Sequence, residues 1–181
     1  MPKAMRPRRS TDPLLLGAIL AGGQARRFGS DKAQALYEGA RLIDRVTAAL
    51  SAQCAGVVVC GREEPGFVCI PDWPEPGLGP LGGLAAALRH AGERGFAQVL
   101  SAGVDVPDLP FDLAAMLAGE GAAIIESQPV VGLWPVSAGL LLEGFMAEGG
   151  RSLYRFADHV GAHRVELARP LMNVNFPEDL T

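Results

Sequence analysis

Several features are scarce in this sequence, and each scarcity excludes a class of protein. Only three of the 181 residues are cysteines and none forms a Cys-x-x-Cys pair, so we expect neither a disulfide scaffold nor a zinc site. No apolar run reaches the roughly 18 residues that a membrane-spanning helix needs. The three histidines show no spacing typical of a metal site or of a base beside a nucleophile. These absences predict a cytoplasmic protein that does not use a Ser–His or Cys–His constellation.

Positive charge is also scarce beyond the first ten residues. The chain has 16 Lys and Arg against 20 Asp and Glu, a net charge of −4, and four of the basic residues lie within residues 1–10. The remainder therefore carries 12 basic against 20 acidic residues, which argues against a nucleic-acid partner because such a partner needs a basic surface. We predict that residues 1–13 form a disordered basic tail and that residues 14–181 form a single domain.

Apolar runs alternate with amphipathic segments along the rest of the chain. Strands are predicted at residues 14–19, 56–60, 67–70, 98–102, 122–125, 130–134 and, as an edge strand, 163–167. Helices are predicted at residues 41–52, from 81 onward, at 111–117, 136–146 and in a short stretch that ends at 157. This alternation favours a three-layer α/β/α domain with a mostly parallel, twisted sheet.

The most informative stretch is residues 20–32, which follows the first predicted strand. It combines two adjacent glycines with three cations, in the order Leu-Ala-Gly-Gly-Gln-Ala-Arg-Arg-Phe-Gly-Ser-Asp-Lys. Gly22 and Gly23 let the backbone approach a ligand closely, and Arg26, Arg27 and Lys32 can balance phosphate charge. The alternative is a tight turn that carries solvated cations. A phosphate-binding loop is the better interpretation.

Two widespread phosphate-binding motifs do not fit this stretch. A P-loop requires Gly-Lys followed by Ser or Thr, whereas Lys32 comes three residues after Gly29 and is followed by Ala33. The dinucleotide fingerprint needs three glycines within six residues, and Gly22 and Gly29 are too far apart for it. Neither of these two nucleotide-binding classes is therefore expected.

Open α/β sheets bind ligands beyond the carboxyl ends of their strands. Three further segments are predicted to lie there. Asp105, after the strand at 98–102, is a candidate Mg²⁺ ligand, and its alternative role is to cap the turn before Pro107. Asp72 precedes the segment Gly-Pro-Leu-Gly-Gly at residues 79–83. Asn173 and Asn175 could bind phosphate or could simply form turns.

These motifs together resemble the small nucleotidyltransferases, and among them most closely the molybdenum cofactor guanylyltransferases. The resemblance rests on residues 20–32, on Asp72 with residues 79–83, on Asp105 and on Asn-Val-Asn at 173–175 with Pro-Glu-Asp-Leu at 177–180. Many sugar-phosphate relatives have Pro-Lys where this chain has Asp31 and Lys32. The resemblance implies a Rossmann-like nucleotidyltransferase fold.

The resemblance also implies an activity, its cofactors and its site residues. The expected reaction transfers GMP from MgGTP to the phosphate of Mo-molybdopterin and releases pyrophosphate. It assigns catalytic roles to Lys32, Arg27 and Asp105, with Asp105 holding Mg²⁺. The nucleotide would be bound by Leu20, Ala21, Gly22, Gly23, Lys32, Asp72, Gly82 and Asp105, and the pterin by Asn173 and Asn175. Molybdoenzymes or their chaperones are the further candidate partners, and no membrane is expected among them.

Two positions bear on the choice of base. Guanylyltransferases have Leu-Ala-Gly-Gly where cytidylyltransferases have Leu-Ala-Ala-Gly, so Gly22 favours GTP. The physical interpretation is that a Cβ at this position would take space that the purine needs. Cys60 stands where the guanylyltransferases commonly have an Asn that contacts the guanosine, which removes one polar contact. The alternatives are a cytidylyltransferase or sugar-phosphate nucleotidyltransferase of the same fold, or a non-catalytic nucleotide-binding partner of molybdoenzymes.

Overall fold

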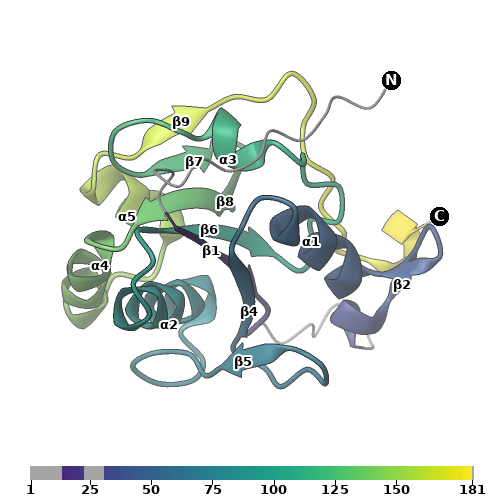
Figure 1. The fold of residues 1–181 in the computed structure, drawn as a ribbon, viewed down its shortest axis with the longest axis horizontal. Helices are drawn as coiled ribbons and strands as arrows, with labels where there is room; N and C mark the ends of the chain where they lie inside the picture. Colours follow the sequence, from purple (N-terminus) through teal and green to yellow (C-terminus); the bar gives the residue numbers. More distant parts are fainter. Residues whose placement is uncertain (1–13, 23–30, 181) are drawn as a thin grey trace.

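The structure is a computed structural model that describes residues 14–22 and 31–180. In this part of the chain seven strands form one sheet, in the order β5-β4-β1-β6-β8-β7-β9 (Figure 1). The strands are β1 (Leu15–Leu20), β4 (Gly56–Cys60), β5 (Val68–Ile70), β6 (Gln98–Gly103), β7 (Ala123–Ile125), β8 (Gln128–Pro135) and β9 (His163–Val165). The segment predicted to be an edge strand, residues 163–167, contains β9 at one edge of the sheet.

The sheet is mostly parallel, as the sequence predicts. β1 pairs in parallel with β4 on one side and with β6 on the other, and β5 extends the parallel set beyond β4. Only β8 runs against its neighbours in this sheet of the described residues, pairing antiparallel with β6 and β7. Leu20 at the end of β1 lies opposite both Cys60 and Gly103, so three parallel strands end at the same level.

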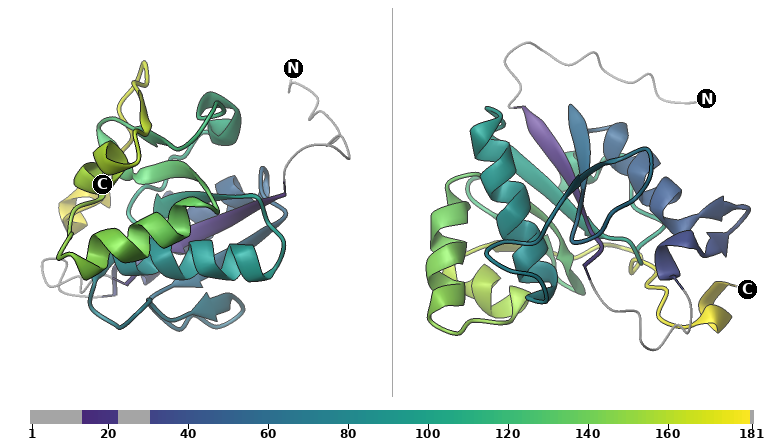
Figure 2. Two further views of the ribbon diagram at one scale, coloured as in Figure 1. Left: turned by 90° about the vertical axis from the view of Figure 1, so that its left-hand side faces the viewer. Right: turned by 90° about the horizontal axis from the view of Figure 1, so that it is seen from below.

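Helices cover both faces of the sheet and complete the predicted three layers (Figure 2). The helices α2 (Gly79–Glu93), α4 (Ala138–Ala147) and α5 (Leu153–His159) pack on one face, and α1 (Leu42–Ser51) and α3 (Leu113–Met116) pack on the other. Every residue of β1 is buried because the strand lies between the two layers. On the α2 face Trp134 stacks on Phe156 with 5.6 Å between ring centroids and donates a hydrogen bond to Ser101 Oγ (3.0 Å).

Two helix boundaries differ from the sequence-based expectation. α2 begins at Gly79, two residues before the expected start near residue 81, because the fixed φ of Pro80 suits the first helical turn. α3 is shorter than residues 111–117, and a turn closed by the hydrogen bond from Leu113 N to Pro110 O (3.3 Å) precedes it. In the described ranges no helix is both long enough and apolar enough to cross a membrane.

A small second sheet lies beside the main one near the carboxyl ends of the strands. β2 (Leu36–Tyr37) and β3 (Ala40–Arg41) form a hairpin that follows the single-turn helix η1 (Lys32–Gln34). Residues 38–39 form the turn of this hairpin, and both have positive φ, 47° for Glu38 and 81° for Gly39. Two consecutive residues of this kind are typical of a tight two-residue hairpin loop. The last of the described residues form the single-turn helix η2 (Pro177–Leu180).

Candidate active site

A cavity of about 360 Å³ lies beyond the carboxyl ends of β1 and β6. Its wall includes residues that end β1 (Leu20, Ala21, Gly22), the first turn of α2 (Gly79, Pro80) and the loop after β6 (Val104, Asp105). β1 has β4 on one side and β6 on the other, which is the position where open α/β sheets bind ligands. The cavity thus lies where the sequence predicts a site.

Two charged side chains meet across this cavity. Lys32, in η1, places its Nζ 3.3 Å from Oδ2 of Asp105, which follows the end of β6. The two side chains are 15% and 29% exposed, so both reach the cavity while the protein shields most of their surface. The structure therefore brings together two residues that are 73 positions apart and that the sequence assigns to phosphate and metal binding.

Asp72 lies beyond β5, close to the backbone of the strand-end loops. It is only 8% exposed, and its Oδ1 has no hydrogen-bond partner among the described residues. A Cβ at Gly22 would lie 2.8 Å from Asp72 Oδ2, and one at Gly61 would lie 2.6 Å from Oδ1. Burial raises the pKa of this carboxyl group above its usual value. Only glycine leaves room at these two positions for a buried carboxylate with an unused acceptor.

This packing changes the physical interpretation of Gly22. From the sequence, a Cβ at Gly22 was expected to take up the space of a purine base. In the structure the first group that such a Cβ would meet is the carboxylate of Asp72. A larger residue at position 22 would therefore displace the Asp72 carboxylate, in addition to narrowing the cavity that Gly22 lines.

The other predicted nucleotide-binding residues fall on the same edge of the sheet or outside the described residues. Gly82 is buried in α2, and its carbonyl oxygen accepts a hydrogen bond from Trp73 N (3.1 Å), which holds the segment that carries Asp72. Cys60 ends β4 with no exposed surface, and burial raises the pKa of its thiol, so it remains a neutral thiol. Gly23 and Arg27 lie outside the residues that the structure describes.

The two predicted pterin-binding residues lie next to Asp105. Val174, between them, donates its backbone N–H to the carbonyl oxygen of Asp105 (2.9 Å). Oδ1 of Asn173 is buried with no hydrogen-bond partner in the described part of the chain, whereas Asn175 is exposed. The backbone N–H groups of Phe176 and Asn175 donate to Asp179 Oδ2 and lower the pKa of that carboxyl group. The closing segment is thus attached directly to the loop that carries Asp105.

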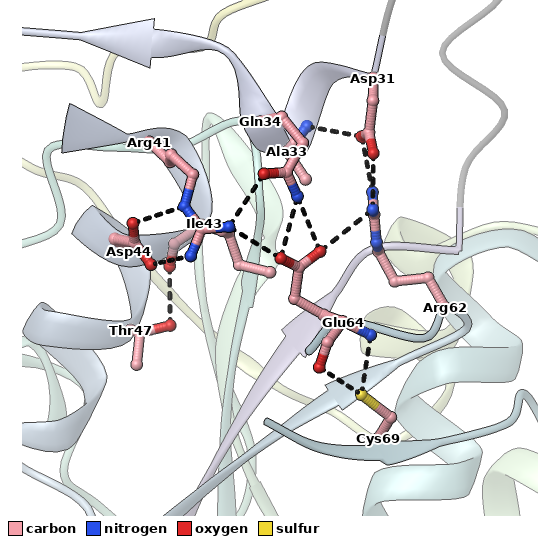
Figure 3. Close-up of polar contacts among 10 residues, drawn as sticks. All are labelled: Asp31, Ala33, Gln34, Arg41, Ile43, Asp44, Thr47, Arg62, Glu64 and Cys69. Atoms are coloured by element: carbon pink, nitrogen blue, oxygen red, sulfur yellow. Dashed lines mark hydrogen bonds and ion pairs between the residues drawn. The ribbon is translucent and has the colours of Figure 1, made fainter. Parts of the chain in front are cut away.

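Two charged residues after β4 are not predicted from the sequence (Figure 3). Arg62 lines the cavity and donates from Nη1 and Nη2 to the two carboxylate oxygens of Asp31, at 2.7 Å each. These hydrogen bonds are the main reason that the pKa of Asp31 lies below its usual value. Glu64 is nearly fully buried and lies 3.1 Å from the same guanidinium. The sequence feature that could have indicated Arg62 is its position just beyond the carboxyl end of a parallel strand.

The donor set at Asp105 suits Mg²⁺. In the described residues no group of three or more His, Cys, Asp or Glu side chains is close enough to hold a metal ion. Mg²⁺ commonly binds through one or two carboxylates together with substrate phosphates and water, so it does not require such a cluster. A partly exposed carboxylate that faces a cavity beside a lysine fits this mode of binding.

The cavity holds a cation with a carboxylate beside it, and the buried carboxylate of Asp72 lies against Gly22, which lines the cavity. This combination suits a ligand with a phosphate chain at one end and a hydrogen-bond-donating ring at the other. Among family models, residues 17–162 match the one described as MobA-like NTP transferase domain. The chain belongs to this family.

Two relatives of similar length support the family assignment. A molybdenum cofactor guanylyltransferase of Cereibacter sphaeroides is 37% identical to this chain, and the match covers 92% of the chain and 93% of that protein. A protein with the same name from Acidiphilium cryptum is 36% identical over 92% of both chains. The resemblance inferred from the four motifs is therefore confirmed at the level of the family.

Solved structures confirm the nucleotidyltransferase fold. Molybdopterin-guanine dinucleotide biosynthesis protein A from Archaeoglobus fulgidus superposes with a TM-score of 0.73 at 23% identity, covering 92% of this chain and 95% of that one. The 2-C-methyl-D-erythritol 4-phosphate cytidylyltransferase from Thermus thermophilus gives a TM-score of 0.70 at 18% identity, with coverage of 93% and 96%. Because proteins named for different bases share this fold, the fold alone does not determine which nucleotide binds.

Proposed function

We propose that this MobA-like protein transfers GMP from MgGTP to the terminal phosphate of Mo-molybdopterin and releases pyrophosphate. The relatives that are 36–37% identical carry the name of this activity. The observation in the structure that supports it best is the Lys32–Asp105 pair at the cavity, with the buried carboxylate of Asp72 close by. The Lys32–Asp105 pair suits the phosphates and the metal, and Asp72 suits the base.

The phosphate end of the nucleotide would lie at Lys32. Its ammonium group is held 3.3 Å from a carboxylate and reaches the cavity from a turn whose N-terminal residue, Asp31, caps it through Ala33 N (3.1 Å). An ammonium group so placed would neutralise charge on the triphosphate and on the departing pyrophosphate. Leu20, Ala21 and Gly22, which line the cavity, would approach the nucleotide through their backbone. Gly23 and Arg27 follow in the sequence and would take part in phosphate binding, as the resemblance implies.

The base would be read by Asp72. Guanine presents two neighbouring donors on its Watson–Crick edge, N1–H and the 2-amino group, and a carboxylate can accept from both. Cytosine presents one amino donor beside an unprotonated ring nitrogen, which a carboxylate disfavours. Oδ1 of Asp72 has no hydrogen-bond partner among the described residues and the side chain is little exposed, so this discrimination would be strong: a base without the matching donors would leave a buried acceptor unpaired.

The reaction needs positioning and charge neutralisation more than it needs a protein nucleophile. An oxygen of the pterin's terminal phosphate would attack the α-phosphorus of GTP, and the bond from that phosphorus to the bridging oxygen of pyrophosphate would break. Lys32 would hold the phosphates in line, and Asn173 and Asn175 would help to place the pterin phosphate beside Asp105. Mg²⁺, held by Asp105, would supply positive charge where phosphate oxygens come together. The product would pass to molybdoenzymes or their chaperones in the cytoplasm.

Thermal unfolding with each nucleoside triphosphate tests this proposal directly. A ligand that binds the folded state raises the melting temperature, and at equal ligand concentration the rise is larger for the ligand that binds more tightly. We expect GTP to give the largest rise of the four nucleotides, and we expect the rise to depend on Mg²⁺ in the wild type but not in Asp105→Asn. A larger rise with CTP would contradict the assignment of the base, and no rise with any of them would contradict nucleotide binding.

A further inference from the structure

Glu64 is a buried carboxylate that joins three separate segments (Figure 3). Its side chain is 1% exposed, although it lies in the short, polar connection between β4 and β5. Both of its carboxylate oxygens accept from Gln34 Nε2 at 2.9 Å. In addition, Arg41 Nη1 donates to Oε1 at 2.9 Å, and Arg62 Nη2 lies 3.1 Å from Oε2.

Two of these contacts lead directly to the turn that carries Lys32. Gln34 is the last residue of η1, and its side chain binds Glu64. Asp31 is the residue before η1, and it is held by Arg62, which in turn contacts Glu64. The turn is therefore fastened on both sides of Lys32 to the same carboxylate. A single turn of 3₁₀-helix has little stability of its own, so these attachments decide where it lies.

The negative charge of the Glu64 carboxylate is balanced by its partners, so replacing Glu64 would disturb the contacts of all of them. A buried carboxylate is costly unless it is paired and hydrogen-bonded, and here two arginines and one amide provide the partners. Arg41 Nη1 also donates to Gln34 Oε1 at 2.9 Å, so the amide of Gln34 is held at both of its ends. The Glu64 network, defined as Asp31, Gln34, Arg41, Arg62 and Glu64, thus specifies one arrangement of the turn.

We propose that Glu64 is a positioning residue for nucleotide binding, which acts by fixing the η1 turn so that Lys32 reaches the phosphates. Glu64 itself is buried behind the turn and does not need to touch the nucleotide. This inference rests on the proposed phosphate-binding role of Lys32, which GTP and CTP would share. The alternative is that Glu64 only stabilises the connection between β4 and β5.

A double-mutant cycle separates these two roles. Glu64→Gln keeps the shape of the side chain. Because each oxygen of Glu64 accepts from Gln34 and lies beside an arginine, the NH₂ group of the new glutamine must face a donor in either orientation. Glu63→Gln is the matched control, since Glu63 is the adjacent residue and is exposed. The wild type, Glu64→Gln, Lys32→Ala and the double variant are compared by displacement of a fluorescent nucleotide analogue with Mg²⁺ present. The competitor is GTP or CTP, whichever binds the wild type more tightly.

If Glu64 acts through Lys32, the two substitutions must be coupled. We expect Glu64→Gln to weaken binding about tenfold when Lys32 is present and no more than about twofold in the Lys32→Ala protein. Glu63→Gln should leave the affinity unchanged. An equal loss in both backgrounds would overturn the positioning role while leaving the proposed function intact. A wild type that binds neither nucleotide would overturn both.

Gln34→Met provides the same test if Glu64→Gln does not fold, as judged by its melting curve. It cuts the direct link between Glu64 and the turn, while Glu64 keeps both arginines and the link through Arg62 to Asp31 remains. Coupling to Lys32→Ala is again expected, with a loss of affinity of about threefold when Lys32 is present. A loss of the same size without Lys32 would contradict the proposal.

Discussion

Replacing Asp72 by Asn should change which purine the enzyme accepts. The substitution keeps the size of a side chain that lies against the backbone of Gly22 and Gly61, so the packing there is preserved. A carboxylate accepts both donors of the guanine edge, whereas an amide keeps one acceptor and turns its NH₂ group toward the other donor. GTP should therefore lose one hydrogen bond and meet an unfavourable contact in its place.

The size of the effect follows from the burial of Asp72. A hydrogen bond to a charged group contributes about 1.5–3 kcal/mol, and the upper part of this range applies where the group is already shielded from water. Asp72 is 8% exposed and one of its oxygens has no partner among the described residues, so guanine would remove little further hydration from it. We expect a loss of about 2–3 kcal/mol, or roughly 30- to 150-fold in kcat/KM for GTP.

Nucleotide analogues make this test decisive. Xanthine has a carbonyl group in place of the 2-amino group of guanine, and the NH₂ of an asparagine can donate to it. Asp72→Asn should therefore use XTP better than the wild type does, and its CTP turnover should change far less than its GTP turnover. Asp112→Asn, at an exposed position, is the control. Equal losses with GTP and CTP and no gain with XTP would show that Asp72 does not read the base.

Four further predictions concern the same site. Asp105→Asn should leave the melting temperature without nucleotide nearly unchanged and reduce Mg²⁺-dependent turnover by about 10²-fold or more; activity within tenfold of the wild type would place the metal elsewhere. Lys32→Ala should raise KM and lower kcat together, and a change in KM alone would remove Lys32 from the groups that act in the transition state. Gly22→Ala should reduce the preference for GTP over CTP by displacing the Asp72 carboxylate, and an unchanged ratio would refute this. Finally, burial raises the pKa of Asp72, so GTP affinity should begin to fall during acidification at a higher pH than for an ordinary aspartate. The contribution of Asp72 to folding stability has the opposite dependence: it is present at low pH and is lost as pH rises through the raised pKa. Both dependences should disappear in Asp72→Asn, and a binding profile identical to that of the wild type would contradict the assignment.

Much of the fold could be predicted because local patterns and long-range packing agree in this chain. The run at residues 14–19 is apolar throughout because β1 is buried between two helix layers, and that is the signal a central parallel strand leaves. At residues 38–39 the sequence and the structure also agree, because glycine suits the positive φ that the hairpin turn has there. The direction of β8 could not be predicted, because an antiparallel strand with buried residues on both faces has no distinctive composition.

The candidate site divides in the same way. Asp105 and Lys32 could be singled out because each follows a recognisable local pattern, and strand ends on one edge of a parallel sheet meet. Glu64 could not, because Arg-Glu-Glu-Pro-Gly at residues 62–66 has the composition of a solvated loop. Its burial depends on Gln34 and Arg41, which lie 30 and 23 positions away. The close packing of Asp72 against Gly22 likewise arises only from the tertiary structure.

The most direct test of the central claim is a competition assay with purified wild-type protein, Mo-molybdopterin, Mg²⁺ and equal concentrations of GTP and CTP. If Asp72 and Gly22 select guanine and Lys32 and Asp105 hold the phosphates, the guanine dinucleotide should predominate, with one pyrophosphate released for each product molecule. A product that is mainly the cytosine dinucleotide would contradict the guanylyl assignment, and the absence of any dinucleotide would contradict the proposed transfer itself.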